Sequence, residues 1–150
     1  MVELLTGEYR NTLDEKGRVS LPSRLREALE EGILYLTRGI HRCVWMIPPL
    51  KWKEISAKLL ESAALSVEKS SLILHRFIGP AQPVEIEKTG RVMVPSSLRN
   101  FAGLSKDCMI LGIGNSIELW DINQYDAFWD THEDKMMAVL EELGPLALFS

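Results

Sequence analysis

The chain has 150 residues, of which 46% are hydrophobic and 25% are charged. This composition is typical of a folded globular protein and argues against a disordered chain. No apolar run approaches the roughly 20 residues that cross a bilayer, and the first residues lack the pattern of a secretory signal. We therefore expect a cytoplasmic protein without a membrane partner. Cys43 and Cys108 lie far apart and the three histidines are scattered, so we expect reduced thiols and no metal site.

Charge is distributed unevenly along the chain. The formal net charge is −4, but residues 10–26 carry five basic side chains against two acidic ones, and acidic residues concentrate in 118–142. Local charge says more about a nucleic-acid partner than the sum does. The basic segment is compatible with DNA binding, but a basic patch alone more often marks an ordinary solvated face.

An internal repeat organises the sequence. Residues 14–26 (DEKGRVSLPSRLR) recur 73 positions later as residues 87–99 (EKTGRVMVPSSLR), and seven of the thirteen residues are identical. The same offset places Gly39 on Gly112 and Val44 on Ile117, which indicates a duplication without gaps. We therefore predict two copies of one module.

Both copies predict the same series of elements. Alternating apolar and polar residues indicate two strands joined at a glycine turn, and a proline then opens a short helix that is followed by two more strands. In the first copy we expect strands at 8–13 and 18–21, a helix at 23–31 stopped by Gly32, and strands at 33–38 and 43–47. In the second copy we expect strands at 84–86 and 91–94, a helix at 96–102 stopped by Gly103, and strands at 109–112 and 117–120.

Amphipathic segments follow each copy. Helical spacing of apolar residues predicts two helices in 48–78, with a break near 62–66, and one acidic helix from 123 to about 143, ended by Gly144-Pro145. The expected division is a first module at 7–52, a helical connector at 53–80, a second module at 81–124, and an acidic C-terminal helix and tail at 125–150. Because each module has only about 45 residues, we expect the copies to interleave their hairpins around a shared core. Apolar helix faces left over predict an oligomer.

The candidate functional residues lie at the two hairpin turns. A glycine allows the chain to reverse, a carboxylate can accept hydrogen bonds from turn amides, and an arginine begins the next strand. A guanidinium held in this way suits contact with a phosphate or a guanine edge. An internal carboxylate–arginine ion pair that only staples the turn fits the spacing equally well. These residues are Asp14, Lys16, Gly17 and Arg18 in the first copy and Glu87, Lys88, Gly90 and Arg91 in the second.

Further arginines lie on the short helices. Arg24 and Arg26 in the first helix could contact phosphates, and Arg99 repeats Arg26. Because Arg26 and Arg99 recur beside apolar helix positions, a structural salt bridge is an equally open interpretation.

Motifs of catalysis are not found in the sequence. Gly112-Ile113-Gly114 begins like a dinucleotide-binding loop, but Ile117 occupies the third glycine position and a strand follows, so we predict a hairpin turn at Gly114-Asn115. No Ser-His-Asp, Cys-His or paired-carboxylate motif is present. We therefore expect neither enzymatic activity nor a cofactor.

The sequence resembles the MraZ family. The resemblance is carried by GEY at 7–9, LDEKGRVSLP at 13–22, LTRG at 36–39, GRV at 90–92 and NSIELWD at 115–121. It implies an α+β fold in which two tandem AbrB/SpoVT-like modules form one pseudo-twofold swapped-hairpin barrel with flanking helices. It also implies a ring-like homo-oligomer that binds double-stranded DNA and is associated with the nucleoid.

The resemblance implies a function and places it on residues. It implies a sequence-specific transcriptional regulator acting on direct repeats upstream of its own division and cell wall gene cluster, with repression the expected effect. The family's Asp-x-x-x-Arg signature falls on Asp14 and Arg18, and its second arginine on Arg91. The second acid is Glu87, and we expect this longer carboxylate to cap its turn less well. The alternative is an antitoxin-like use of the same fold, in which the long helices bind a partner protein.

Overall fold

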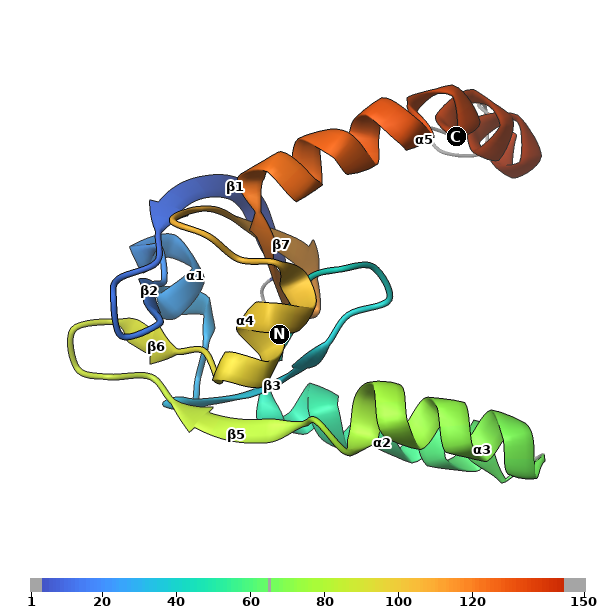
Figure 1. Cartoon of the computed structure of the whole chain (residues 1–150), viewed down its shortest axis with the longest axis horizontal. Helices are drawn as coiled ribbons and strands as arrows, with labels where there is room; N and C mark the ends of the chain where they lie inside the picture. Colours follow the sequence, from blue (N-terminus) through green and yellow to red (C-terminus); the bar gives the residue numbers. More distant parts are fainter. Residues whose placement is uncertain (1–3, 65, 145–150) are drawn as a thin grey trace.

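Both repeats contribute strands to one six-stranded antiparallel sheet, with the order β1-β7-β8-β4-β3-β5 (Figure 1). The structure is a computed structural model that describes residues 4–64 and 66–144. The strands are β1 (Leu5–Thr12), β2 (Arg18–Ser20), β3 (Ile33–Arg38), β4 (Val44–Ile47), β5 (Gln82–Glu85), β6 (Arg91–Met93), β7 (Asp107–Gly114) and β8 (Ile117–Asp121). The helices are α1 (Ser23–Ala28), α2 (Pro49–Ala63), α3 (Val67–Ile73), the π-helix η1 (Leu74–Ile78), α4 (Ser96–Ala102) and α5 (Ile122–Leu143).

Strands of the two copies pair with each other. β1 of the first copy pairs with β7 of the second, and β5 of the second pairs with β3 of the first. β2 and β6 form a separate two-stranded ribbon in which Val19 lies opposite Val92. The hairpins therefore interleave, as their small size predicts. β1 and β5 are the two edges of the larger sheet, so the sheet does not close into a barrel.

The core lies between the sheet, the β2–β6 ribbon and the short helices α1 and α4. Equivalent residues of the two copies fill it: Val19 and Val92 are 0% exposed, and Leu25 and Leu98 are 1% and 0% exposed. Burial of a side chain of this size contributes roughly 1.5–3 kcal/mol. The ribbon that carries the candidate site is thus anchored by the main core of the protein.

The two short helices end differently. α4 ends at Gly103, which adopts a left-handed conformation (φ 60°), as the sequence predicts. α1 ends at Ala28, three residues before the predicted end, because Leu29 is extended (φ −92°, ψ 121°) and packs against the core. The prediction that Gly32 stops this helix is therefore wrong.

The repeat contains one shift of register. Leu36 lies opposite Met46 in the first copy, and the equivalent pair in the second copy is Ile110 and Leu119. Met46 and Leu119 keep the offset of 73, whereas Ile110 lies one residue further along. The second copy thus has one more residue before β7 and one fewer in the β7–β8 turn. The gapless alignment of Gly39 with Gly112 is wrong, since hydrogen-bond register places Arg38 at the position of Gly112.

Two helical arms project from the β-structure toward the same side (Figure 1). The α2–α3 arm breaks where predicted, and the Ser66 side chain caps α3 by accepting a hydrogen bond from the Lys69 amide (3.0 Å). In α5, the Asp121 carboxylate accepts bonds from the amides of Asn123 (3.1 Å) and Gln124 (3.3 Å). The predicted tail beyond Gly144 lies outside the described residues. No helix in the described part is long and apolar enough to cross a membrane.

Both cysteines are buried free thiols. Burial raises the pKa of Cys43 far above its usual range and raises the pKa of Cys108 to about 11. Both sulfurs are therefore protonated and poorly nucleophilic at neutral pH.

Candidate nucleic-acid interface

The candidate site is built on two equivalent hairpin backbones. The amide of Asp14 donates to the carbonyl of Arg18 (2.9 Å), and the amide of Glu87 donates to the carbonyl of Arg91 (2.9 Å). Each turn is closed by a glycine amide that donates to the carbonyl of the acid three residues earlier, at 3.0 Å in the first copy and 2.8 Å in the second. The sequence repeat is thus a repeat of backbone geometry.

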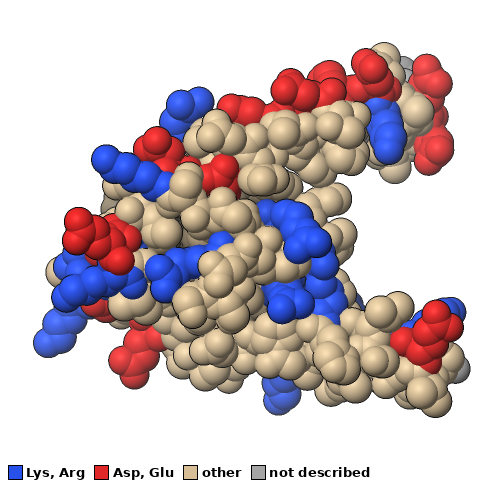
Figure 2. Space-filling model, viewed as in Figure 1, with Lys and Arg blue, Asp and Glu red and all other residues tan. Residues whose placement is uncertain are grey.

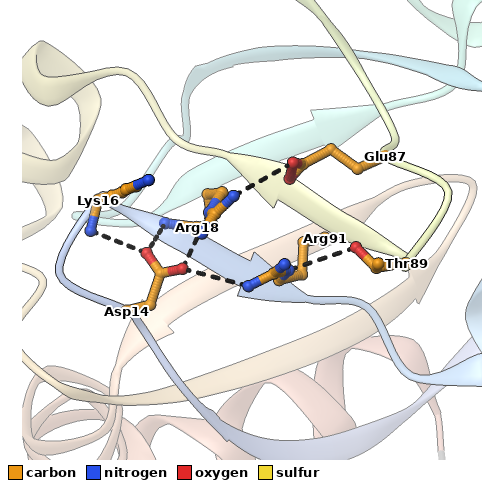
Figure 3. Close-up of polar contacts among 6 residues, drawn as sticks. All are labelled: Asp14, Lys16, Arg18, Glu87, Thr89 and Arg91. Atoms are coloured by element: carbon orange, nitrogen blue, oxygen red, sulfur yellow. Dashed lines mark hydrogen bonds and ion pairs between the residues drawn. The ribbon is translucent and has the colours of Figure 1, made fainter.

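The two turns belong to one ribbon, and each is hydrogen-bonded to the chain of the other copy. The amide of Val94 donates to the carbonyl of Gly17 (2.9 Å), and the amide of Leu21 donates to the carbonyl of Gly90 (2.9 Å). Gly17 and Gly90 both adopt positive φ angles, 86° and 85°. The ribbon therefore carries both turns, and Figure 3 shows how their side chains lie on it.

The acid of the first hairpin caps its own turn. Oδ1 of Asp14 accepts hydrogen bonds from the amides of Lys16 (2.9 Å) and Arg18 (2.8 Å). These bonds, with that from the Arg18 amide foremost, hold the pKa of Asp14 below its ordinary value of 3.8. The carboxylate therefore stays ionised and fixes the start of the strand that carries Arg18.

The acid of the second hairpin does not do the same. Oε1 of Glu87 lies 3.4 Å from Nη1 of Arg18, across the ribbon, and Oε2 is buried without a hydrogen-bond partner among the described residues. No turn amide of the described chain donates to this carboxylate. The longer side chain of Glu87 forms an ion pair with the other copy and does not cap its own turn, in line with our expectation of weaker capping.

The arginines form one network with these acids (Figure 3). Nε of Arg18 lies 2.9 Å from Oδ2 of Asp14, and Nη1 of Arg91 lies 3.7 Å from the same oxygen. Nε of Arg91 donates to Oγ1 of Thr89 (3.3 Å). The hydrogen bond to Asp14 is the main reason that the pKa of Arg18 is raised. The stapling ion pair therefore exists, and it also orients the arginines.

The ion pairs leave donors free. Within the described residues, Nη2 of Arg18 and Nη2 of Arg91 take part in no hydrogen bond. The side chains are 21% and 36% exposed. Each guanidinium thus keeps an accessible edge toward solvent, and the stapling and DNA-contacting interpretations are compatible.

The remaining predicted residues separate into two groups. Lys16 and Lys88 are exposed at the two turns, and Arg24 is exposed on α1. None of the three forms an ion pair with any residue of the described chain. Their charges are therefore available to a ligand.

Arg26 and Arg99 lie behind the turns instead. A Cβ atom added at Gly17 would lie 2.6 Å from Cζ of Arg99, and one added at Gly90 would lie 2.6 Å from Cζ of Arg26. Each helix arginine thus packs against the turn of the other copy. The salt bridge we considered is not formed within the described residues, and Nε of both arginines is buried without a hydrogen-bond partner there. Their recurrence in both copies left a structural role open. The contact that each arginine makes, with the turn of the other copy, exists because the hairpins of the two copies interleave.

Comparison with known proteins identifies the family. A family model described as "MraZ protein, putative antitoxin-like" matches residues 4–74 and 77–143. The "Transcriptional regulator MraZ" of Treponema denticola is 43% identical over 142 residues, which cover 95% of this chain and 99% of that protein. The "Transcriptional regulator MraZ" of Treponema pallidum (strain Nichols) is 42% identical over 143 residues, which cover 95% of this chain and 96% of that protein. The chain belongs to the MraZ family, which confirms the resemblance seen in the sequence.

A solved structure was also compared. The solution structure of PHS018 from Pyrococcus horikoshii covers 78% of this chain and 88% of its own, with 15% identity and a TM-score of 0.30. This likeness is too low to define the fold.

Proposed function

We propose that the protein is a sequence-specific DNA-binding transcriptional regulator whose β2–β6 ribbon contacts double-stranded DNA. The observation that carries the proposal is the pair of hairpins that hold Arg18 and Arg91 on one rigid ribbon with free guanidinium donors. Membership of a family whose curated relatives are named transcriptional regulators supports it. Repression of its own division and cell wall gene cluster, from direct repeats upstream of that cluster, is the expected action.

The chemistry of recognition follows from the side chains. A two-stranded ribbon is narrow enough to enter the major groove. There an arginine can donate two hydrogen bonds to O6 and N7 of guanine, whereas a lysine contacts phosphates as a point charge. We therefore assign base contacts to Arg18 and Arg91, and phosphate contacts to Lys16, Lys88 and Arg24.

One ribbon would make few base contacts, so affinity needs several ribbons acting together. We propose a ring-like homo-oligomer, associated with the nucleoid in the cytoplasm, whose ribbons engage successive repeats. In this proposal the modules at 7–52 and 81–124 form an AbrB/SpoVT-like swapped-hairpin unit. Apolar side chains of the connector at 53–80 and of α5 supply surfaces for self-association.

The test is the affinity for DNA from upstream of the protein's own gene. We expect Arg18→Ala to weaken binding about 5- to 150-fold, since a bidentate guanine contact discriminates by about 1–3 kcal/mol. Lys53→Ala, which removes one exposed positive charge from α2, is the matched control and should bind as wild type does. Undiminished binding by Arg18→Ala, with unchanged circular dichroism, would refute the assignment.

An antitoxin-like protein-interaction module is the second candidate. The description of the matched family supports it, and so do large apolar side chains on the α2–α3 arm: Leu50 is 70% exposed and Val67 is 89% exposed. In this case the long helices would bind a partner protein. Formation of a stoichiometric complex with that partner, together with no affinity for the upstream DNA, would favour this function.

A further inference from the structure

A cluster of three arginines surrounds one aromatic ring, away from the hairpins. The guanidinium carbons of Arg38, Arg42 and Arg76 lie 5.1, 4.7 and 4.5 Å from the centroid of the Phe101 ring. Arg38 lies at the end of β3 and Arg42 in the β3–β4 loop. Arg76 lies in η1, and Phe101 lies in α4. We call Arg38, Arg42 and Arg76 the arginine cluster. Only the tertiary fold brings these segments together, so no local sequence pattern marks the cluster.

The cluster is held in place by the fold. Nε and Nη2 of Arg76 donate to the carbonyls of Gly39 (3.1 Å) and Ile40 (2.8 Å), which fixes the β3–β4 loop that carries Arg42. Stacking on Phe101 adds a cation–π attraction to each guanidinium. The three charges are therefore positioned before any ligand arrives.

The arginine cluster takes part in no ion pair within the described chain. The ion pairs found there join Arg18 and Arg91 to the hairpin acids and Lys51 to Glu54. Nε of Arg38 is buried without a hydrogen-bond partner among the described residues. The pKa of Arg76 is lowered first by burial and then by the charges of Arg42 and Arg38. Three like charges at one ring repel each other, and an anion placed between them would relieve that repulsion.

The same chain carries a complementary surface on α5. Acidic residues recur at spacings of three, four and seven positions and therefore share one side of the helix. All are exposed, and none forms an ion pair with another described residue. We call this set the acidic stripe, and it consists of Asp126, Asp130, Glu133, Asp134 and Glu141.

The acidic stripe points away from the arginine cluster of the same chain, because α5 leads away from the β-structure (Figure 1). The first turns of α5 are fixed to the body, where the rings of Tyr125 and Phe128 pack on Trp120 at 5.4 and 5.3 Å. A helix of 22 residues is roughly 33 Å long, and α5 leads away from the β-structure (Figure 1). Figure 2 shows acidic atoms along this arm and basic atoms gathered at the base of the notch between the two arms. The acidic stripe therefore lies where a second molecule can reach it.

We propose that the arginine cluster is the docking site for the acidic stripe of α5 from a second copy of the chain. The proposal rests on the self-association that we proposed above, and is independent of DNA contact by the hairpins. Guanidinium groups bind carboxylates through paired hydrogen bonds, which suits three arginines facing a row of acids. A DNA phosphate is the competing occupant. The second copy is favoured because the β3–β4 loop, which carries Arg42, lies on the side of the arms, whereas the β2–β6 ribbon lies on the opposite side (Figure 1).

The test is a mixing experiment without DNA. Arg42→Glu reverses one charge of the cluster at an exposed loop position, and Asp130→Lys with Asp134→Lys reverses the stripe. We expect each variant alone to have a lower mass than wild type by light scattering after size exclusion. An equimolar mixture should regain a larger species that contains both variants, because each supplies the face that the other lacks. Lys53→Glu, an equal charge reversal on α2, should keep the wild-type mass.

Other outcomes would overturn the proposal. A monomeric wild type, wild-type mass for both variants, or a mixture that stays dissociated each contradicts it. If Arg42→Glu keeps its mass but binds all DNA sequences more weakly with a shallower salt dependence, the occupant is phosphate. Arg18→Ala separates the two proposals, because it should lose affinity for DNA and keep the wild-type mass.

Discussion

The two hairpins share a backbone and differ in one carboxylate. Both turns close with the same hydrogen bonds and the same glycine conformation. Asp14 caps its turn through the amides of Lys16 and Arg18, whereas Glu87 reaches across to Arg18 instead. One additional methylene group thus changes the role of the acid from ordering its own turn to balancing the charge of its neighbour. A duplicated fold can thus keep its geometry while its two sites diverge.

The largest effect is expected from the turn glycines. Gly17→Ala places a side chain in a left-handed conformation, which costs roughly 1–2 kcal/mol, and its Cβ would meet Arg99 at 2.6 Å. Gly90→Ala meets Arg26 at the same distance and should lower the free energy of unfolding equally. Urea denaturation measures both. Gly32→Ala, where an added Cβ meets nothing within 4 Å, is the control and should change stability little. Unequal losses at Gly17 and Gly90 would show that the backbones are not equivalent.

A smaller effect should follow from exchanging the acids. Glu87→Asp would allow the shorter carboxylate to accept bonds from the amides of Thr89 and Arg91, as Asp14 does in the first copy. Each such bond contributes about 0.5–1.5 kcal/mol net, whereas the partly exposed ion pair that is lost contributes about 0–1 kcal/mol. We therefore expect a modest gain in the free energy of unfolding and, for Asp14→Glu, a modest loss. A loss of stability in Glu87→Asp would mean that the ion pair with Arg18 matters more than the cap.

The smallest effect is a pH dependence confined to the first hairpin. Because its hydrogen bonds lower the pKa of Asp14 below 3.8, the stabilising contribution is fully present above that pH. It is lost as pH falls through the lower pKa of the folded state. Wild type should therefore lose stability on acidification more steeply than Asp14→Asn, as followed by thermal melts from pH 5 to about pH 2. Parallel curves for the two proteins would contradict the capping role.

Turns and helices that are set by residues close together in the chain could be predicted from the sequence. The glycine at each turn, the proline before each short helix and the periodicity of residues 123–143 predicted β2, β6, α4 and α5 to within one residue. The first strand of each hairpin begins earlier than predicted, at Leu5 instead of residue 8 and at Gln82 instead of residue 84. Asp14 and Arg18 were found because both the duplication and the family resemblance mark them. The early end of α1 was missed because it depends on the core contact of Leu29.

Features that depend on tertiary contact were not predictable in the same way. The shift that places Arg38 opposite Val44, and Gly112 opposite Ile117, is set by strand pairing and not by sequence identity. The contacts of Arg26 and Arg99 with the opposite turns exist only because the hairpins interleave. The arginine cluster likewise brings three segments of the chain to the Phe101 ring of a fourth segment.

The most direct test of the account compares the two arginines on the same DNA. Arg18→Ala and Arg91→Ala each remove one guanidinium from equivalent positions of the ribbon, so affinity for the upstream DNA, measured at several salt concentrations, compares the hairpins themselves. Because Asp14 caps the first turn and fixes Arg18, we predict that Arg18→Ala loses more affinity than Arg91→Ala, and that both lose more than Lys53→Ala. Wild-type affinity in both arginine variants, with the fold intact, would contradict the central claim that this ribbon binds DNA.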